Sequence, residues 1–120
     1  MRHAVEAGRA DLQVASVEAL PFAACSFDKV CTVNTIYFWP DMQAALHEVR
    51  RVLRPGGSFA ICFNPEHELR KWPGHKFGFA LYAEEAVEQL LAGVGFQTIS
   101  TSRRHDPDQG EIACVSAVRP

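Results

Sequence analysis

The chain has 120 residues, of which 48% are hydrophobic and 22% are charged, and its formal net charge is −2. This length predicts one domain, and the apolar share is sufficient for a hydrophobic core. Twelve basic residues against fourteen acidic ones provide neither a basic stripe for nucleic acid nor a polybasic patch for an anionic membrane, so we expect partners of neither kind.

The four cysteines (Cys25, Cys31, Cys62 and Cys114) include no Cys-x-x-Cys pair, so their spacing indicates neither a zinc knuckle nor a thioredoxin-like motif. The last three lie in apolar runs and are expected to be buried, reduced thiols, which suits a reducing compartment. No hydrophobic signal segment is visible at the start, and no apolar run approaches the roughly 20 residues that span a bilayer. The sequence therefore predicts a cytoplasmic protein.

Short apolar runs alternate with helical patterns along the chain, which is typical of α/β architecture. Residues 1–8 are expected to end a helix at Gly8, and residues 12–15 to form a short strand. A loop through Leu20-Pro21-Phe22 follows. Residues 27–33 form the next expected strand because β-forming residues dominate there.

The clearest expected helix spans residues 41–53. Its apolar residues recur at steps of three and four and therefore share one face: Met42, Ala45, Leu46, Val49, Val52 and Leu53. Asp41 is a natural N-cap, and Arg54-Pro55-Gly56-Gly57 ends the helix. Residues 58–63 then form an apolar strand without clean alternation. We expect it to be covered on both faces and to pair in parallel with residues 27–33.

A second helix is expected over residues 83–92, where apolar side chains again share one face. Two strands follow, at residues 96–102 and 112–118. The connection from His105 to Gly110 is rich in turn residues, so these two strands are expected to form an antiparallel hairpin.

Three segments carry a family pattern. The first is Glu18-Ala19-Leu20-Pro21-Phe22, followed by Ser26-Phe27-Asp28. The second is residues 34–41 (Asn-Thr-Ile-Tyr-Phe-Trp-Pro-Asp), directly after a strand, and the third is residues 48–57 (Glu-Val-Arg-Arg-Val-Leu-Arg-Pro-Gly-Gly). In this order and at this spacing, they resemble the type 11 branch of the class I S-adenosylmethionine-dependent methyltransferase domain. The resemblance covers essentially the whole chain, since residues 92–96 resemble the usual entry into the family's sixth strand.

The resemblance implies a partial class I methyltransferase sheet, Rossmann-like and mostly parallel, with an antiparallel strand from the C-terminal hairpin. Residues 12–15 and 27–33 correspond to the third and fourth strands, residues 58–63 to the fifth, and the hairpin to the sixth and seventh. The first two strands and the glycine-rich cofactor loop have no counterpart, because Gly56-Gly57 follows a helix and precedes a strand. We therefore expect residues 1–120 to form a single, N-terminally incomplete domain.

The resemblance also implies S-adenosylmethionine as cofactor, bound beyond the carboxyl ends of the strands. Ser16 stands where the family commonly has an aspartate that accepts from the adenine amine, and Val17 would offer its backbone N–H to the ring. Asn34 and Thr35 form the turn that passes the methionine portion, and Tyr37 lies at the mouth of the site. The alternatives are that Ser16 only forms a turn and that the aromatic cluster Tyr37-Phe38-Trp39 only packs in the core.

Trp39, Trp72 and Phe77 are the residues expected to line the acceptor side. Two of them lie in residues 64–82, a long aromatic segment that is a candidate lid. The alternative is a surface loop pinned by its aromatic residues. These side chains favour an apolar or planar acceptor.

Methyl transfer depends mainly on alignment of the acceptor with the methyl group, so no catalytic motif is expected and no catalytic residue is assigned. The five histidines are candidate bases if the acceptor must lose a proton. His47 is expected to be exposed. No metal site is expected, because Lys71 stands where a second zinc-binding histidine would follow His67.

Three functions stay open from the sequence. The first is an S-adenosylmethionine-dependent methyltransferase acting on a small-molecule acceptor. The second is a non-catalytic truncated fragment, and the third is a partner-dependent interaction module, in which a homodimer mate or another chain covers an exposed sheet edge. A glycine-rich loop encoded upstream favours the first, cofactor-free monomeric behaviour the second, and a stable dimer sharing the edge the third.

Overall fold

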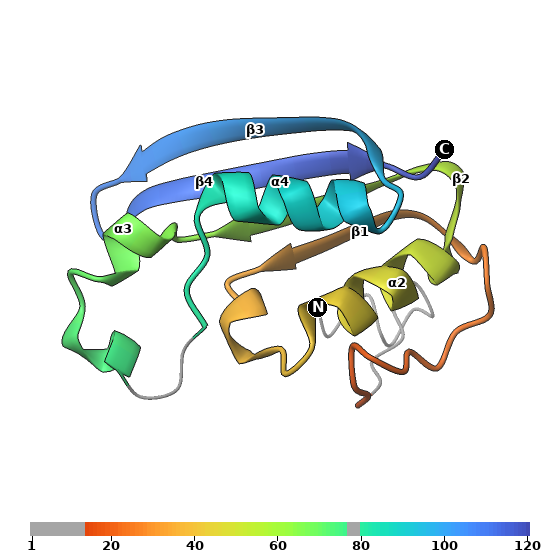
Figure 1. Cartoon of the computed structure of the whole chain (residues 1–120), viewed down its shortest axis with the longest axis horizontal. Coiled ribbons are helices and arrows are strands. Elements are labelled where there is room, and N and C mark those ends of the chain that lie inside the picture. Colours follow the sequence, from red (N-terminus) through yellow and green to blue (C-terminus); the bar gives the residue numbers. More distant parts are fainter. Residues whose placement is uncertain (1–13, 77–79) are drawn as a thin grey trace, which may run out of the picture.

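The computed structural model describes residues 14–76 and 80–120. In chain order the elements are β1 (Phe27–Val33), the 3-10 helix η1 (Ile36–Phe38), α2 (Met42–Val52), β2 (Leu53–Phe63), α3 (Glu66–Leu69), the 3-10 helix η2 (Pro73–Lys76), α4 (Glu84–Gly93), β3 (Gln97–Asp106) and β4 (Gly110–Val118). The strands form one sheet in the order β1-β2-β4-β3 (Figure 1). β1 and β2 pair in parallel, and β4 runs antiparallel to both of its neighbours. The last strand is therefore antiparallel, as expected, and it lies between the strands that correspond to the fifth and sixth of the predicted scheme.

Helices α2 and α4 lie on the same face of the sheet (Figure 1). Along β2, Phe59, Ile61 and Phe63 are buried against this helical layer, while the residues between them stay partly exposed on the other face. The prediction that residues 58–63 are covered on both faces is therefore wrong for the described part of the chain. The apolar run hides an alternation in burial, because successive strand side chains point to opposite faces.

Both predicted helices are confirmed to within about one residue at each end. The side chain of Asp41 accepts a hydrogen bond from the backbone N–H of Ala44 at 3.1 Å, which is the expected N-cap of α2. The apolar faces of α2 and α4 meet in one core cluster, to which β2 and β4 also contribute. No helix in the described ranges is long and apolar enough to cross a membrane.

The strand at residues 27–33 is confirmed with the predicted bounds, whereas β2 begins at Leu53 instead of residue 58. Leu53 already pairs with Phe27, and an irregular stretch separates this pair from the regular ladder that starts at Ser58. Gly56 has a φ of +83°, and a Cβ at Gly57 would lie 2.8 Å from the carbonyl oxygen of Arg54. The helix stop is thus a tight turn that requires its glycines.

The C-terminal hairpin is confirmed but is longer than predicted. Only residues 107–109 form the turn, and His105 lies in β3 instead of the connecting loop. The side chain of Asp106 closes the turn by accepting from the N–H groups of Asp108 and Gln109, at 2.8 and 2.9 Å. This use of an aspartate side chain shortens the connection.

The strand predicted at residues 12–15 is wrong where it can be examined. Val14 and Ala15 belong to no strand, and Ser16 forms an isolated bridge with Ala19. The side chain of Val14 is fully exposed, so no sheet neighbour buries it. Residues 12 and 13, and the helix end predicted over residues 1–8, lie outside the described residues.

The expectation of buried, reduced cysteines is also wrong. Cys62 and Cys114 are Cα partners in the β2–β4 ladder and are joined by a disulfide, and Cys31 is exposed on β1. The 52 residues that separate the paired cysteines conceal a contact that only the sheet register creates. The argument for a reducing compartment from these cysteines no longer holds.

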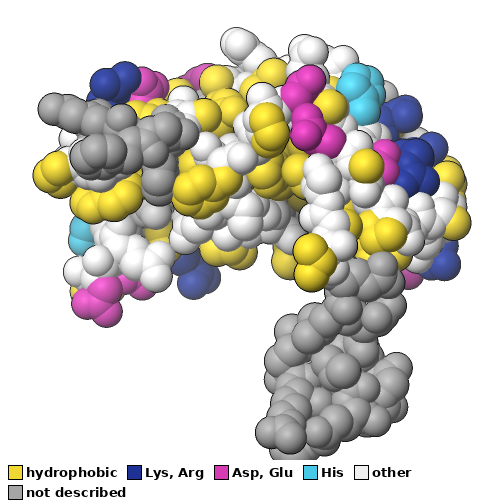
Figure 2. Space-filling model, turned by 90° about the horizontal axis from the view of Figure 1, so that it is seen from below, with side chains coloured by type: hydrophobic (Ala, Val, Ile, Leu, Met, Phe, Trp, Pro, Cys, Tyr) yellow, Lys and Arg dark blue, Asp and Glu magenta, His cyan; other side chains and the backbone are white. Residues whose placement is uncertain are grey.

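β1 forms one edge of the described sheet. Hydrophobic side chains are spread over the face of the molecule seen in Figure 2, among charged and other side chains. Close to this edge a hollow of about 300 Å³ is lined by Phe22, Phe27 and Val30 together with Leu20, Lys29 and Val52. Among the described residues, this edge therefore presents both strand backbone without a neighbouring strand and apolar surface.

The C-terminal end of α2 is capped from the far end of the chain. The guanidinium of Arg119 donates to the carbonyl oxygen of Arg50 at 2.8 Å and to that of Leu53 at closer range. The backbone of Arg119 pairs with Gly56 and Gly57, at 2.7 and 2.9 Å. The last carbonyls of a helix lack intrahelical partners and carry the negative end of its dipole, so a guanidinium stabilises them on both counts.

Replacing Arg119 with methionine should lower the free energy of unfolding by about 1–3 kcal/mol, because charge-assisted hydrogen bonds are lost. Urea denaturation followed by circular dichroism measures the change. Arg104→Met, at an exposed position of β3, is the matched control and should cost less than about 0.5 kcal/mol. Equal losses in the two variants would contradict the capping role.

Candidate functional site

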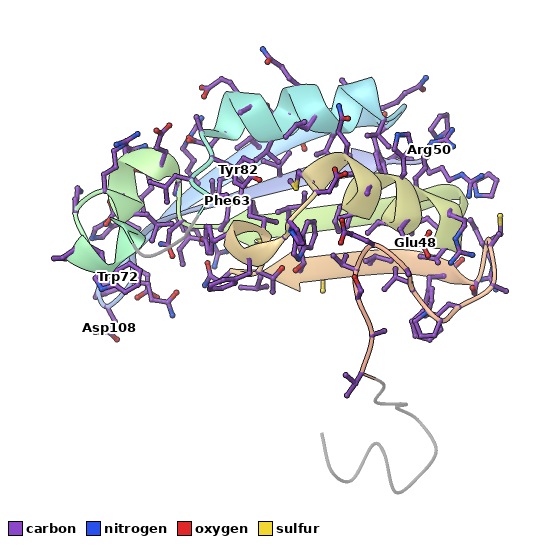
Figure 3. All side chains as sticks on the ribbon, turned by 60° about the horizontal axis from the view of Figure 1, so that its bottom comes forward. Glu48, Arg50, Phe63, Trp72, Tyr82 and Asp108 are labelled. Atoms are coloured by element: carbon purple, nitrogen blue, oxygen red, sulfur yellow. A yellow bond between two sulfur atoms is a disulfide. The ribbon has the colours of Figure 1, made fainter. Side chains whose placement is uncertain are left out.

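A cavity of about 660 Å³ opens at the carboxyl ends of β1 and β2. Asn34 and Asn64, which directly follow these two strands, line it together with Trp72 and the turn at residues 107–110; Glu68, Leu69, Lys71 and Pro73 complete the lining. Trp72 and Asp108 lie at this same end of the sheet (Figure 3). In open α/β sheets, ligands bind in the crevice beyond the carboxyl ends of the strands.

Asn34 turns the chain out of β1. Its φ is +55°, in the left-handed region that asparagine tolerates better than most residues. Its N–H donates to the carbonyl oxygen of Cys62 at 2.8 Å, and its Oδ1 accepts from the hydroxyl of Tyr37 at 2.9 Å. No other protein group in the described ranges takes up the amide nitrogen of Asn34, which therefore remains available as a donor at the cavity.

The hydroxyl of Tyr37 joins the ends of two strands. It donates to Asn34 and accepts from the backbone N–H of Asn64, at 2.9 and 2.5 Å. The residue is 4% exposed, and burial raises the pKa of its phenol although the N–H of Asn64 acts in the opposite sense. Tyr37 does not line the cavity. It lies behind the cavity as a neutral phenol that positions both asparagines.

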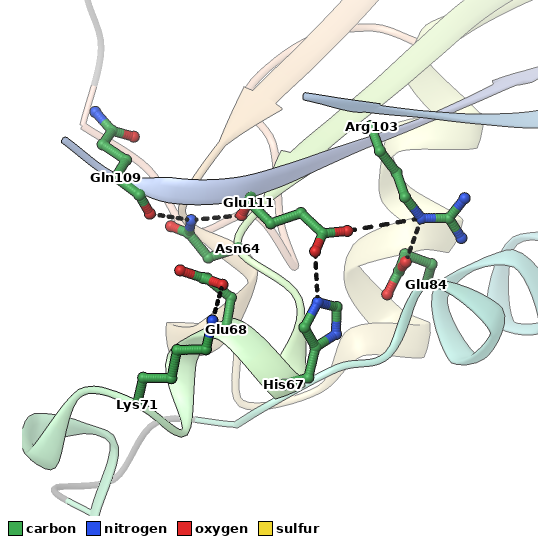
Figure 4. Close-up of polar contacts among 8 residues, drawn as sticks. All are labelled: Asn64, His67, Glu68, Lys71, Glu84, Arg103, Gln109 and Glu111. Carbon is green, nitrogen blue, oxygen red and sulfur yellow. Dashed lines mark hydrogen bonds and ion pairs between the residues drawn. The ribbon is translucent and has the colours of Figure 1, made fainter. Parts of the chain in front are cut away.

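The side chain of Asn64 connects the end of β2 to the hairpin. Its amide nitrogen donates to the carbonyl oxygens of Gln109 and Glu111, at 3.0 and 2.9 Å (Figure 4). Because Gln109 lines the cavity and Asn64 follows a strand directly, this contact holds the hairpin turn at the cavity wall.

Ion pairs fasten α3 and α4 to the same hairpin (Figure 4). His67 Nε2 lies 2.7 Å from a carboxylate oxygen of Glu111, and this partner raises the pKa of His67. Arg103 Nε lies 2.6 Å from the carboxylate of Glu84 and 3.9 Å from that of Glu111. Glu84 is only 6% exposed. Burial is the largest single influence on its pKa and acts to raise it, but the hydrogen bonds from Arg103 and from the backbone N–H of Glu84, together with the charges of Arg103 and His67, outweigh burial, and the pKa is lowered.

Glu68 lies directly over Gly110, where an added Cβ would come within 1.8 Å of the carboxylate oxygen. Its pKa is lowered, chiefly by the hydrogen bond from Lys71 at 2.9 Å. The side-chain ligand atoms of His67, Glu68 and Glu111 lie within 4.8 Å of one another. They are engaged with each other and with Lys71, and we assign no metal to them.

The predicted adenine-binding pair does not line this cavity. Ser16 Oγ accepts from the N–H of Glu18 at 3.2 Å, and the carbonyl oxygen of Ser16 accepts from Ala19 at 3.1 Å, which is turn chemistry. Val17 packs partly against the core. The hydroxyl of Thr35 is hydrogen-bonded to that of Thr32.

The predicted acceptor residues are placed differently from one another. Trp72 is 48% exposed and lines the cavity, and its indole lies against Gly74, where an added Cβ would approach to 2.1 Å. Trp39 packs against the core and does not line the cavity. Phe77 lies outside the described residues. The segment from residue 64 to 82, expected to be a long loop, contains α3 and η2.

The cavity therefore brings together two predicted residues, Asn34 and Trp72, with several that the sequence did not single out. Asn64 had a usable signal, since it directly follows a strand as Asn34 does. Asp108 and Gln109 had none, because only the β2–β4 register places the hairpin turn beside β2. Among the candidate bases, His47 is exposed on α2 as predicted.

Glu48 binds the first motif segment to α2. Its carboxylate accepts from the N–H of Leu20 at 2.7 Å and from Arg51 Nη2 at 2.6 Å, and Arg51 also donates to the carbonyl oxygen of Leu20 at 3.1 Å. The hydrogen bond from Arg51 is the main reason that the pKa of Glu48 is lowered. Two of the three motif segments thus form one structural unit.

Comparison with known proteins gives a consistent result. Residues 1–61 match a family model described as a methyltransferase domain. The O-methyltransferase resE of Aspergillus sclerotiorum is 35% identical over 109 residues, covering 80% of this chain and 39% of that protein. The chain spans about two fifths of the length of the curated relatives it matches.

Solved structures show the same fold. A SAM-dependent methyltransferase from Thermotoga maritima superposes with a TM-score of 0.78 at 20% identity, covering 88% of this chain and 62% of that one. The [4+2]-cyclase SpnF superposes with a TM-score of 0.79 at 16% identity, covering 99% and 61%. These matches confirm a Rossmann-like α/β sheet with an antiparallel hairpin strand.

Replacing Tyr37 with phenylalanine should lower the free energy of unfolding by about 1–2 kcal/mol, since the buried N–H of Asn64 loses its acceptor. Thermal or urea unfolding measures this loss. Tyr82→Phe, at a half-buried tyrosine outside this hydrogen-bond chain, is the control and should cost less. A Tyr37→Phe variant as stable as the wild type would contradict the bridging role.

The contribution of Glu48 should depend on pH. Because the folded state holds its pKa below the ordinary value, this stabilisation is present above the ordinary carboxyl pKa and is lost as the pH falls through the lower folded value. Glu48→Gln should therefore cost about 1–2 kcal/mol at pH 7 and clearly less at pH 3. Urea unfolding at both pH values tests this, with Glu85→Gln, exposed on α4, as control. If Glu48→Gln lowered the free energy of unfolding by the same amount at both pH values, the proposed contribution of the Glu48 carboxylate would be contradicted.

Proposed function

Because the chain belongs to the methyltransferase domain family, we propose that it transfers a methyl group from S-adenosylmethionine to a small-molecule acceptor. The observation that carries this proposal is the cavity at the carboxyl ends of β1 and β2, which joins Asn34 to Trp72. This is where sheets of this class bind ligands. Its volume of about 660 Å³ is in the range of small-molecule sites.

The residues at the end of β1 fit the methionine portion of the cofactor, which carries a carboxylate and an amino group. Tyr37 occupies the side-chain oxygen of Asn34, so the amide nitrogen is the group left for a ligand, and we propose the backbone N–H of Thr35 as a second donor. Ser16 and Val17 are proposed for the adenine. The Ser16 hydroxyl still has a hydrogen to donate and a second lone pair.

When bound, S-adenosylmethionine supplies a methyl group on a positively charged sulfur, which is an activated leaving group. The protein then has to align the acceptor and exclude competing geometries. The hydrogen bonds of Tyr37 to Asn34 and Asn64 fix the ends of two strands, and Asn64 fixes the cavity wall that the hairpin turn forms. This chain of contacts is suited to alignment because each member is held by another.

We propose that the acceptor lies against the indole of Trp72, between Leu69, Pro73 and Pro107, which also line the cavity. Such walls favour a planar or apolar molecule. Glu68 and Asp108 are the carboxylates of the lining. Lys71 holds the pKa of Glu68 low, which makes Glu68 a weak base, and no catalytic base is assigned.

Calorimetric titration with S-adenosylhomocysteine tests the cofactor part of the proposal, with circular dichroism to establish that each variant is folded. We expect saturable binding that Asn34→Asp weakens at least about tenfold, because the change keeps the left-handed turn but replaces a donor with a negative charge. Gln43→Ala, exposed on α2, is the matched control. Absence of binding by a folded chain would contradict cofactor binding by these residues.

The Trp72→Ala substitution distinguishes acceptor binding from cofactor binding. It should leave the affinity for S-adenosylhomocysteine within about twofold while lowering radiolabelled methyl transfer to a panel of planar hydroxyaromatic acceptors at least about tenfold. If both properties fell together, Trp72 would belong to the cofactor site or to the structure. If neither changed, the acceptor would lie elsewhere.

A further inference from the structure

Two cysteines link neighbouring strands on the face of the sheet that α2 and α4 leave uncovered. Cys62 in β2 and Cys114 in β4 are Cα partners in the antiparallel ladder, with their Cα atoms 4.1 Å apart, and a disulfide joins them. Residues directly opposite each other in such a ladder have neighbouring Cβ atoms whether or not a bond connects their side chains. The strand register therefore keeps the two cysteines adjacent after reduction, so that the bond between them can form again.

The disulfide lies on the partly exposed face of the sheet. Both cysteines are half-buried, while the residues that flank them in β2 and β4 point into the core and are fully buried. Cys31, a free and exposed cysteine, lies one strand away opposite Ala60. Exchange proceeds by attack of a thiolate on a disulfide sulfur, so access decides whether a disulfide is labile or inert.

The same pair lies beside the contacts that hold the cavity. The carbonyl oxygen of Cys62 accepts the N–H of Asn34 at 2.8 Å. Asn64, two residues after Cys62, donates to the carbonyl oxygens of Gln109 and Glu111, and Cys114 follows Glu111 by three residues. The disulfide thus ties β2 to the hairpin close to Asn34, Asn64 and Gln109, which line the cavity.

From this placement we propose that Cys62 and Cys114 form a reversible redox switch that orders the cavity when oxidised and loosens its hairpin wall when reduced. The partner is a small disulfide such as glutathione disulfide. Its S–S bond breaks, a bond forms between the two cysteine sulfurs, and the two cysteine protons leave with two molecules of glutathione. The reverse reaction restores both thiols. This proposal does not depend on the methyltransferase function.

Thiol counting tests the redox step. The intact chain is equilibrated in a series of glutathione and glutathione disulfide ratios, quenched in acid, unfolded and alkylated, and the labels are counted by mass spectrometry. We expect two labels in the oxidised chain, on Cys25 and Cys31, four in the reduced chain, and a midpoint inside the series. The Cys31→Ala variant should carry one label when oxidised and three labels when reduced. Four labels in every buffer, or two in every buffer, would overturn the proposal.

Hydrogen exchange tests the link to the cavity. Reduction should raise amide exchange at least about threefold in residues 64–69 and 107–111, since local opening sets these rates, and should change α4 little. Cys62→Ala should reproduce the reduced wild type, and Cys31→Ala should behave as the oxidised wild type. If Cys62→Ala does not fold, the reduced wild type alone is compared with the oxidised wild type. If reduction raised amide exchange uniformly along the chain, or changed it in neither segment, the disulfide would have no specific effect on the cavity. Either result would overturn the proposed switch.

Discussion

One buried hydroxyl, that of Tyr37, determines the geometry of the site. It lies between the ends of β1 and β2, donates to the side chain of Asn34 and accepts from the backbone of Asn64. A buried polar group without partners is costly, so the three residues stabilise one arrangement and disfavour others. Asn64 then extends this order to the hairpin through two further hydrogen bonds. The cavity walls are consequently set by contacts behind the cavity.

The ion pairs around the hairpin contribute position more than stability. Those of His67, Lys71 and Arg103 involve side chains that are about half exposed or more, and solvent screening leaves exposed pairs of this kind with little effect on stability. Glu84 is different, since it is buried and paired with Arg103. Removing that partner would leave a buried charge, which makes the start of α4 the most sensitive point of this network.

The fold by itself does not decide the reaction. Similar sheets occur in a SAM-dependent methyltransferase and in a [4+2]-cyclase, so function has to be argued from the residues at the strand ends. Here the relevant features are a donor held at Asn34, an indole supported by Gly74 and a hairpin wall tied to β2. The disulfide between Cys62 and Cys114 adds a covalent link to the same wall.

The sequence by itself determined the local elements of this protein. The apolar steps along residues 41–53 and the Asp41 cap specify α2, and the turn residues before Gly110 specify the hairpin, because each depends on neighbours close in the chain. Only the tertiary structure decided which face of β2 is covered, that Cys62 meets Cys114, and that Asp108 and Gln109 join Asn34 at one cavity. These contacts follow from strand order and register, which bring distant residues together without leaving a local pattern.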